Sequence, residues 1–202
     1  MRNRLLILIF VALATKSLAQ APADEHTLHI CADNYMKGAF ELKQFERAEK
    51  ELKECMIGKK FPSFSATAMD GKKYSSADLK NKVVLVSCWF IGCAPCVAEI
   101  PVFNELNQEF KGQGFILLTF TRDQIEYLTK FIKEKSINYT VFPNADELIE
   151  RKWKMVYGYP ANFILSKKGE IVEFSGGGPT DEPGLQLAKE KFRKIIIAEV
   201  AK

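Results

Sequence analysis

Histidine is scarce in this chain of 202 residues, and its two histidines, His26 and His29, lie together near the N-terminus. A structural zinc site needs about four protein ligands. After residue 58 the chain holds one Cys-x-x-Cys sequence and neither a second such pair nor a pair of histidines. The sequence therefore predicts no structural metal site there and no cofactor. His26 and His29, close to Cys31, could hold a metal weakly, but a polar linker is the simpler interpretation.

Long apolar runs are also lacking. The apolar stretch over residues 5–14 has about half of the roughly 20 residues that a membrane-spanning helix requires. It follows Arg2 and Arg4 and precedes small residues, which predicts a cleaved secretory signal peptide over residues 1–19. The mature protein is then expected to be soluble and periplasmic or otherwise extracytoplasmic, with an uncleaved membrane anchor as the alternative. No cysteine follows the small residues, which argues against a lipid anchor.

An excess of charge of one sign is absent once this leader is removed. The full chain carries 29 Lys+Arg against 25 Asp+Glu, and the leader holds three of the basic residues and none of the acidic ones. The mature chain is therefore almost neutral. This balance gives no electrostatic reason to bind nucleic acid or an anionic membrane.

Two cysteines separated by two residues, Cys93 and Cys96, are the most informative feature that the chain does contain. They follow the apolar run 83–86 and precede a helical pattern, so they lie between the end of a strand and the first turn of a helix. Unpaired N–H groups and the positive end of the helix dipole stabilise a thiolate there. Because a thiolate attacks disulfides, this placement predicts thiol–disulfide exchange. The alternatives are a pair of ordinary buried cysteines and half of a zinc site.

The positions of the two cysteines predict a role for each. Cys93, at the helix start and the more exposed of the pair, is the predicted nucleophile. Cys96, one turn further in, is the predicted resolving thiol, close enough to form a disulfide. Ala94 and Pro95 add neither positive charge nor N–H donors, which favours a reductant or isomerase over a strong oxidant. Cys88, within a predicted buried strand, is interpreted as a small core side chain.

The pattern of apolar residues divides the mature chain near Gly58. Residues 20–58 form an N-terminal extension, and residues 59–202 form one domain. Between residues 33 and 56, apolar side chains recur every three or four positions, with Lys and Glu between them. This periodicity predicts an amphipathic helix that lies on a surface or packs against the domain.

The extension also contains Cys31 and Cys55, one near each end of the predicted helix. If the helix is continuous, the two residues lie about 36 Å apart, which is far beyond disulfide distance. A break at Gly38 would fold the segment back and permit a bond. The sequence leaves both arrangements open.

The domain alternates predicted strands and helices. A short hairpin around Asp70-Gly71 and a helical turn precede two buried strands, each followed by a helix. A third helix, a β-hairpin and a long helix capped by Thr180 or Asp181 complete the chain. This thioredoxin-type order predicts an α/β fold with a mixed central sheet that helices cover on both faces. The predicted strands are 64–68, 72–74, 82–90, 115–120, 161–166 and 171–174, and the predicted helices are 76–79, 94–111, 123–135, 145–156 and 180–200.

Several short motifs occur in a characteristic order within this domain. They are Phe-Pro-x-Phe at 61–64, Asp-Leu-Lys-Asn-Lys at 78–82, Cys-x-Pro-Cys at 93–96, Glu-Ile-Pro at 99–101 and Gly-Tyr-Pro at 158–160. In combination, residues 61–200 resemble the TlpA/ResA branch of the thioredoxin superfamily, which is related to the AhpC/TSA redoxins. Members of this branch are extracytoplasmic thiol–disulfide oxidoreductases. They usually carry Trp immediately before the first cysteine, where this chain has Gly92, so we expect a more open site.

The resemblance implies roles for further residues. Glu99 corresponds to a carboxylate beneath the dithiol, where a half-buried acid raises the pKa of the thiols and relays a proton. Pro160 is expected to be a cis-proline that faces the dithiol, and Tyr159 is expected to present backbone groups to the substrate. Trp89 is interpreted as an aromatic residue beside the site. The alternatives are that Glu99 is a charge in an early helical turn, favoured there by the helix dipole, and that Gly-Tyr-Pro is a simple turn.

Three functions follow as hypotheses. The first is a reductase of protein disulfides, which the resemblance links to a membrane thiol–disulfide electron donor and to cytochrome c maturation. The second is a peroxiredoxin-like thiol peroxidase, whose reactive cysteine would follow a Pro-x-x-x-Thr sequence that is missing before Cys93. The third is a copper metallochaperone, which would need Cys-x-x-x-Cys spacing and a histidine within the domain.

Overall fold

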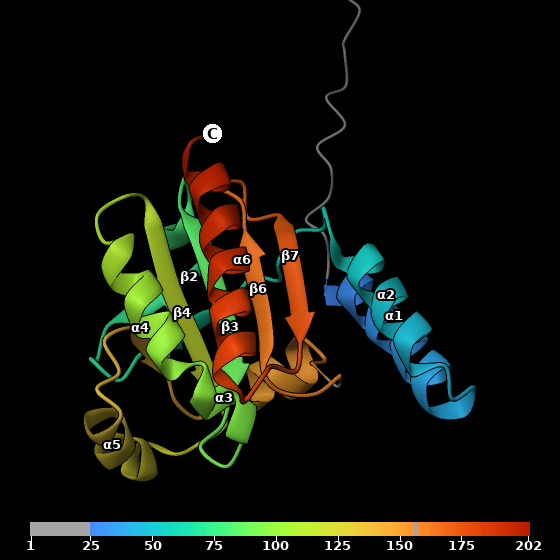
Figure 1. The fold of residues 1–202 in the computed structure, drawn as a ribbon, viewed down its shortest axis with the longest axis horizontal. Coiled ribbons are helices and arrows are strands. Elements are labelled where there is room, and N and C mark those ends of the chain that lie inside the picture. Colours follow the sequence, from blue (N-terminus) through green and yellow to red (C-terminus); the bar gives the residue numbers. More distant parts are fainter. Residues whose placement is uncertain (1–24, 156) are drawn as a thin grey trace, which may run out of the picture.

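A five-stranded mixed sheet forms the centre of the computed structural model, which describes residues 25–155 and 157–202 (Figure 1). The predicted signal peptide, residues 1–19, lies outside the described residues. The strand order is β5-β4-β3-β6-β7, in which β3, β4 and β5 are parallel and β6 is antiparallel to both β3 and β7. The strands are β3 (Val83–Trp89), β4 (Phe115–Thr121), β5 (Thr140–Phe142), β6 (Ala161–Leu165) and β7 (Ile171–Gly176).

The central strand β3 is buried along its whole length, as its run of Val and Leu predicts. Successive side chains of a strand point to opposite faces of the sheet. Val84 and Val86 pack in one core, and Val83 and Leu85 pack in a second core on the other face. Two hydrophobic cores, one on each face, therefore hold the sheet.

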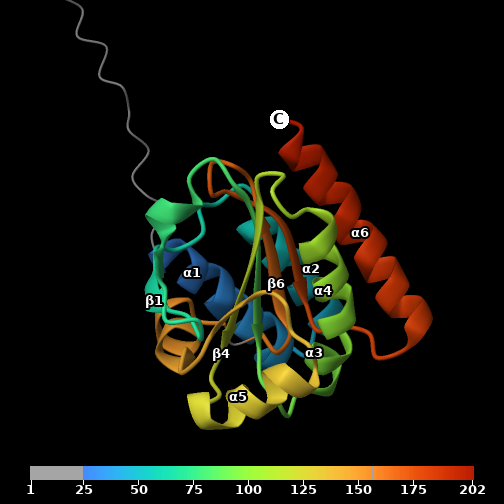
Figure 2. The ribbon, with the colours of Figure 1, turned by 90° about the vertical axis from the view of Figure 1, so that its left-hand side faces the viewer.

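Helices cover both faces, as predicted. On one face lie α4 (Ile100–Glu109) and α6 (Glu182–Val200). On the other lie α1 and the small hairpin formed by β1 (Ser65–Thr67) and β2 (Lys73–Ser75) (Figure 2). The predicted cap of the last helix is confirmed, because the Asp181 side chain accepts a hydrogen bond from the first turn of α6.

The amphipathic helix predicted over residues 33–56 is not one helix, because the segment forms a helical hairpin. It consists of α1 (Glu25–Met36), one π-helical turn, η1 (Lys37–Glu41), and α2 (Phe45–Met56). The two helices approach closely at Gly38, where a Cβ atom would lie 3.0 Å from the Cβ of Ala48. A glycine at this position therefore allows the two helices to pack closely. The chain itself turns back at residues 42–44, where Lys43 has a φ of 54°.

The hairpin brings Cys31 and Cys55 together in a disulfide, with their Cα atoms 5.8 Å apart. The folded-back arrangement is thus the correct one of the two that the sequence left open, although the turn lies at residues 42–44 and not at Gly38. Further contacts join α1 to the domain: the Nε2 of His29 donates a hydrogen bond to the Lys152 carbonyl oxygen, 2.9 Å away. Among the described residues, no helix has the length and apolar composition of a membrane span.

Removing this second disulfide should destabilise the oxidised protein. Closing a loop of 24 residues restricts the unfolded chain, so the Cys31→Ser/Cys55→Ser double variant should lose about 3 kcal/mol of unfolding free energy. Urea denaturation of the oxidised proteins measures this loss. The matched control, Cys93→Ser/Cys96→Ser, removes a disulfide that closes a far shorter loop and should lose less unfolding free energy. Equal midpoints for the Cys31→Ser/Cys55→Ser variant and the unmodified protein would contradict the prediction.

The predicted helix over residues 94–111 is also wrong in one respect. It divides into α3 (Ala94–Ala98) and α4, with Glu99 at the junction. Pro101 lacks the N–H that would bond to the Val97 carbonyl in an unbroken helix, so the regular pattern is interrupted there. The interruption matters for the site because it fixes the position of Glu99.

Two further elements differ from the sequence prediction. The strand β5 was not predicted, because its three residues are too few for an alternating pattern to be recognised. The predicted helix over residues 145–156 is a π-helix, η3 (Glu147–Lys152), in which the Trp153 N–H donates to the Leu148 carbonyl five residues earlier. This wider turn places the Trp153 side chain in the core. The helix after β4, α5 (Ile125–Glu134), agrees with the prediction apart from its ends.

Candidate active site

Cys93 and Cys96 are joined by a disulfide where β3 ends and α3 begins. Cys93 is the N-cap residue of α3, and its Sγ accepts a hydrogen bond from the Cys96 backbone N–H, 3.3 Å away. A hydrogen bond to sulfur stabilises the thiolate after reduction. Cys93 is 6 % exposed and Cys96 4 % exposed. The pair is therefore nearly buried in the oxidised protein. Cys93 is the more exposed of the two cysteines, as predicted, but only slightly.

A small apolar cluster surrounds the disulfide. Trp89, Leu128 and Val141 are buried in the same cluster as the two cysteines. The ring of Trp89 lies 5.8 Å from the ring of Phe131 on α5. The structure thus places Trp89 beside the disulfide, although its side chain is buried and not open to a substrate.

The turn before β6 lies at the same end of the sheet. Ala161, the first residue of β6, pairs with Cys88 near the end of β3, because the two strands are antiparallel. The Tyr159–Pro160 peptide bond that precedes it is cis, as the resemblance implies. The half-buried ring of Tyr159 packs edge-to-face against Phe90, with 5.2 Å between the ring centres. The predicted substrate-binding turn therefore stands next to the strand end that carries the dithiol.

Glu99 is buried beneath this end of the sheet, at 2 % exposure. Its two carboxylate oxygens accept hydrogen bonds of 3.1 and 3.0 Å from the Nδ2 of Asn162 on β6. Burial raises the pKa of Glu99 to about 7, and the hydrogen bond from Asn162 opposes this rise. A carboxyl group with a pKa near neutrality can take up and release protons at physiological pH.

Phe90 and Arg122 lie beside Gly92, which is exposed. A Cβ atom on Gly92 would lie 3.3 Å from the Phe90 ring. The guanidinium of Arg122 lies over this ring, 4.2 Å from its centre. A stacked Phe–Arg pair from two strand ends is thus next to the position before Cys93.

Comparison with known proteins identifies the family. A sequence model described as the AhpC/TSA family matches residues 57–174. The chain belongs to this family. The matched region includes the Cys93–Cys96 disulfide, the cis-proline, β3 to β6 and most of β7, whereas the N-terminal helical hairpin precedes it.

Several similar proteins are thiol–disulfide oxidoreductases by name. The chain is 33 % identical over 149 residues to the thiol-disulfide oxidoreductase ResA of Bacillus cereus, covering 71 % of this chain and 82 % of the relative. It is 32 % identical over 149 residues to ResA of Bacillus anthracis, with the same shares covered. A solved thiol:disulfide interchange protein of the thioredoxin family from Chlorobium tepidum superposes with a TM-score of 0.59 at 26 % identity, covering 70 % of this chain and 95 % of that one. These similarities and the Cys93–Cys96 bond identify a ResA-like thiol–disulfide oxidoreductase.

Three residues of this site were not predicted from the sequence. The sequence predicts Asn162 only as part of a strand. A polar residue in a buried strand nevertheless indicates a buried hydrogen-bond partner. Phe90 and Arg122 follow β3 and β4, and the carboxyl ends of adjacent parallel strands meet at one edge. That rule brings their backbones together, but it does not predict that their side chains stack.

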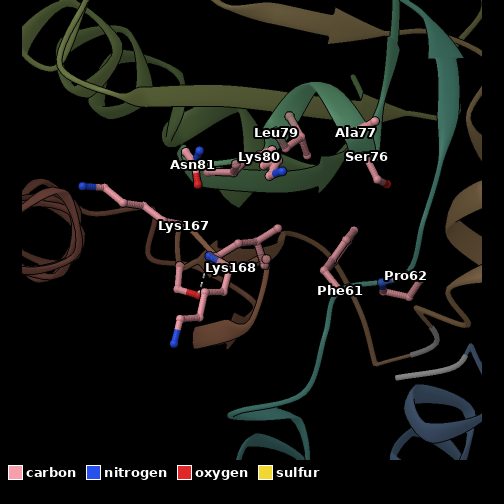
Figure 3. Close-up of a pocket in the computed structure, with 13 residues that line it drawn as sticks. Phe61, Pro62, Ser76, Ala77, Leu79, Lys80, Asn81, Lys167 and Lys168 are labelled. Atoms are coloured by element: carbon pink, nitrogen blue, oxygen red, sulfur yellow. Dashed lines mark hydrogen bonds between the residues drawn. The ribbon is translucent and has the colours of Figure 1, made fainter. Parts of the chain in front are cut away.

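A separate cavity of about 500 Å³ lies at the other end of the sheet (Figure 3). Residues before β3, such as Leu79 and Lys80, form one wall, and the turn between β6 and β7, with Lys168, forms another. The disulfide follows the opposite end of β3. This cavity is therefore not part of the candidate active site.

Proposed function

We propose that this protein reduces disulfide bonds in client proteins outside the cytoplasm, with Cys93 as nucleophile and Cys96 as resolving thiol. The observation that carries the proposal is the Cys93–Cys96 disulfide at the start of α3. The names of the ResA relatives support the same chemistry. Tyr159 and the cis-proline Pro160, at the same end of the sheet, are proposed to hold the client chain, with Trp89 as the apolar wall behind the sulfurs.

The reaction needs two exchanges. The Cys93 thiolate attacks one sulfur of the client disulfide, forms a mixed disulfide and releases the other client sulfur as a thiolate. Cys96 then loses its proton and attacks the Cys93 sulfur, which breaks the mixed disulfide and frees the second client thiolate. Two electrons pass to the client, and the protein is left with the Cys93–Cys96 disulfide that the structure describes. A membrane thiol–disulfide donor is the proposed source of the electrons that restore the dithiol.

Glu99 is proposed to accept the proton that Cys96 loses. It follows Cys96 by three residues, a spacing that places side chains on the same face of a helix. Its pKa of about 7 suits a group that takes a proton at neutral pH and returns it to solvent. The role is tested by Glu99→Gln, which should slow the second exchange and shift the titration of the thiols.

Two observations support a location outside the cytoplasm. The sequence of residues 1–19 has the pattern of a cleaved secretory leader. Independently, Cys31 and Cys55 form a disulfide between two helices of the hairpin, and structural disulfides persist mainly in oxidising compartments. Clients in cytochrome c maturation are the class that the family resemblance suggests.

The competing activities can be separated by one set of assays. We expect the reduced protein to reduce insulin disulfides, with the Cys93–Cys96 bond forming in step. It should not consume peroxide faster than a free dithiol, nor retain Cu(I). The Cys93→Ser/Cys96→Ser variant is the control. Peroxide turnover without insulin reduction, or a reduction potential near the strongly oxidising end of the known range, would contradict the proposal.

A further inference from the structure

The side-chain amide of Asn162 and the carboxyl of Glu99 form an isolated polar pair inside the protein. Asn162 is 1 % exposed. An ionised carboxyl only accepts hydrogen bonds, so the amide must turn its nitrogen toward Glu99, and Nδ2 serves both carboxylate oxygens. The amide oxygen, Oδ1, is left buried without a hydrogen-bond partner among the described residues.

An unpaired acceptor in this position is unusual, because buried polar atoms in native proteins nearly always find a partner. Protonation of Glu99 would supply one, since a neutral carboxyl group carries an O–H donor. A swing of the amide would let Oδ1 accept that O–H while Nδ2 keeps its bond to the other carboxyl oxygen. Every polar atom of the pair would then be satisfied.

We propose that Asn162 is a positioning residue that holds Glu99 in both of its charge states. Nδ2 stabilises the carboxylate, and Oδ1 accepts the O–H of the carboxyl group after it receives the Cys96 proton. The pair therefore keeps the acid in place while its charge changes. This inference rests on the proposed role of Glu99, because the proton that it handles is the one released when Cys96 attacks the mixed disulfide.

The surroundings of Glu99 offer no other charged partner among the described residues. From the segment before β5, Tyr139 faces it, and the pKa of Tyr139 is raised by burial and by the Glu99 charge. From the loop after β7, Gly178 closes over the carboxyl: a Cβ there would lie 3.1 Å from Glu99 Oε1 and 3.2 Å from Pro160 Cγ. On α3 the nearby cysteines are bonded to each other in the oxidised form. The amide is thus the polar side chain that favours ionisation of Glu99 against the effect of burial.

The test replaces the amide in two ways. Asn162→Leu keeps the approximate size and removes both hydrogen-bonding atoms, so the titration midpoint of Glu99 should rise by about one pH unit or more, a roughly tenfold change in its ionisation equilibrium. Asn162→Thr places a hydroxyl there, which both donates and accepts, and should restore much of the normal midpoint. The midpoint is read from the ¹³C NMR signal of the Glu99 carboxyl in the oxidised protein, assigned with Glu99→Gln.

A second readout needs no variant at Asn162. In protein labelled at asparagine, the infrared carbonyl band of Asn162 should shift as Glu99 takes up its proton, because Oδ1 then accepts a hydrogen bond. Ser175→Ala is the matched control for the NMR titration of Asn162→Leu. Ser175 pairs with Asn162 across β6 and β7, and its replacement should leave the Glu99 midpoint unchanged.

Three results would overturn the inference: a Glu99 midpoint that Asn162→Leu leaves in place, an equal shift in Ser175→Ala, or an asparagine band that does not respond to the titration. If Asn162→Leu fails to fold, the infrared measurement still decides. The proposed function fails separately, if Glu99→Gln leaves the second exchange at its normal rate. That outcome would leave both spectroscopic readouts of the pair intact.

Discussion

A Cys96→Ser variant is expected to stop the reaction at the mixed disulfide and to remain covalently joined to its client through Cys93. The serine hydroxyl cannot displace the client from the Cys93 sulfur, so turnover with a disulfide substrate should fall by about 10³-fold or more, the order expected when a residue that forms a covalent intermediate is lost. Cys93→Ser should lose activity to the same extent but form no adduct. This difference assigns the nucleophile.

The adduct is measured by non-reducing electrophoresis and mass spectrometry after the variant is expressed in its native compartment. Cys88→Ala is the matched control, because Cys88 is the remaining free cysteine of the described chain and is fully buried. Burial raises the pKa of its thiol and keeps it unreactive. A stable adduct through Cys96 in Cys93→Ser, or full activity in either single variant, would reverse the assignment. The captured proteins would also show whether clients belong to cytochrome c maturation.

Glu99→Gln is expected to stabilise the oxidised protein above pH 7 and to change its stability little near pH 4. Burial raises the pKa of Glu99 from 4.5 in the unfolded chain to about 7 in the folded protein. Between these values the folded protein binds more protons than the unfolded chain, so the free energy of unfolding falls as the pH rises. The fall attributable to Glu99 is about 3 kcal/mol across this window. Glutamine is neutral throughout and still accepts a hydrogen bond from Asn162. The Glu99→Gln variant should therefore lack the part of the pH dependence of unfolding free energy that Glu99 causes.

Urea denaturation of the oxidised protein at several values between pH 4 and pH 8 measures the effect. Glu126→Gln provides the control, because Glu126 is an exposed acid in the first turn of α5 and should leave the pH dependence almost unchanged. Parallel curves for Glu99→Gln and the unmodified protein would show that the folded protein does not hold this carboxyl in a raised-pKa environment.

The elements that the sequence predicted well are those with strong local patterns. The buried strands β3 and β4 have continuous apolar runs, the β6–β7 hairpin has a clear turn at residues 167–169, and α6 begins at its capping residue. The errors fall where the local pattern was regular but the chain is interrupted, at residues 42–44 and before Pro101. Helical periodicity continues on either side of both places, and periodicity alone does not show where a helix ends or bends.

The sequence alone determined the chemistry of this protein, because two cysteines between a strand and a helix define a redox-active pair through local spacing. It also determined the fold class, since the order of strands and helices permits few arrangements. Only the tertiary structure decided what surrounds the pair. Asn162 meets Glu99 across 63 residues of chain, and Cys31 meets Cys55 across 24. Such contacts arise when distant segments pack together, and the spacing of residues along the chain does not show which distant side chains will touch.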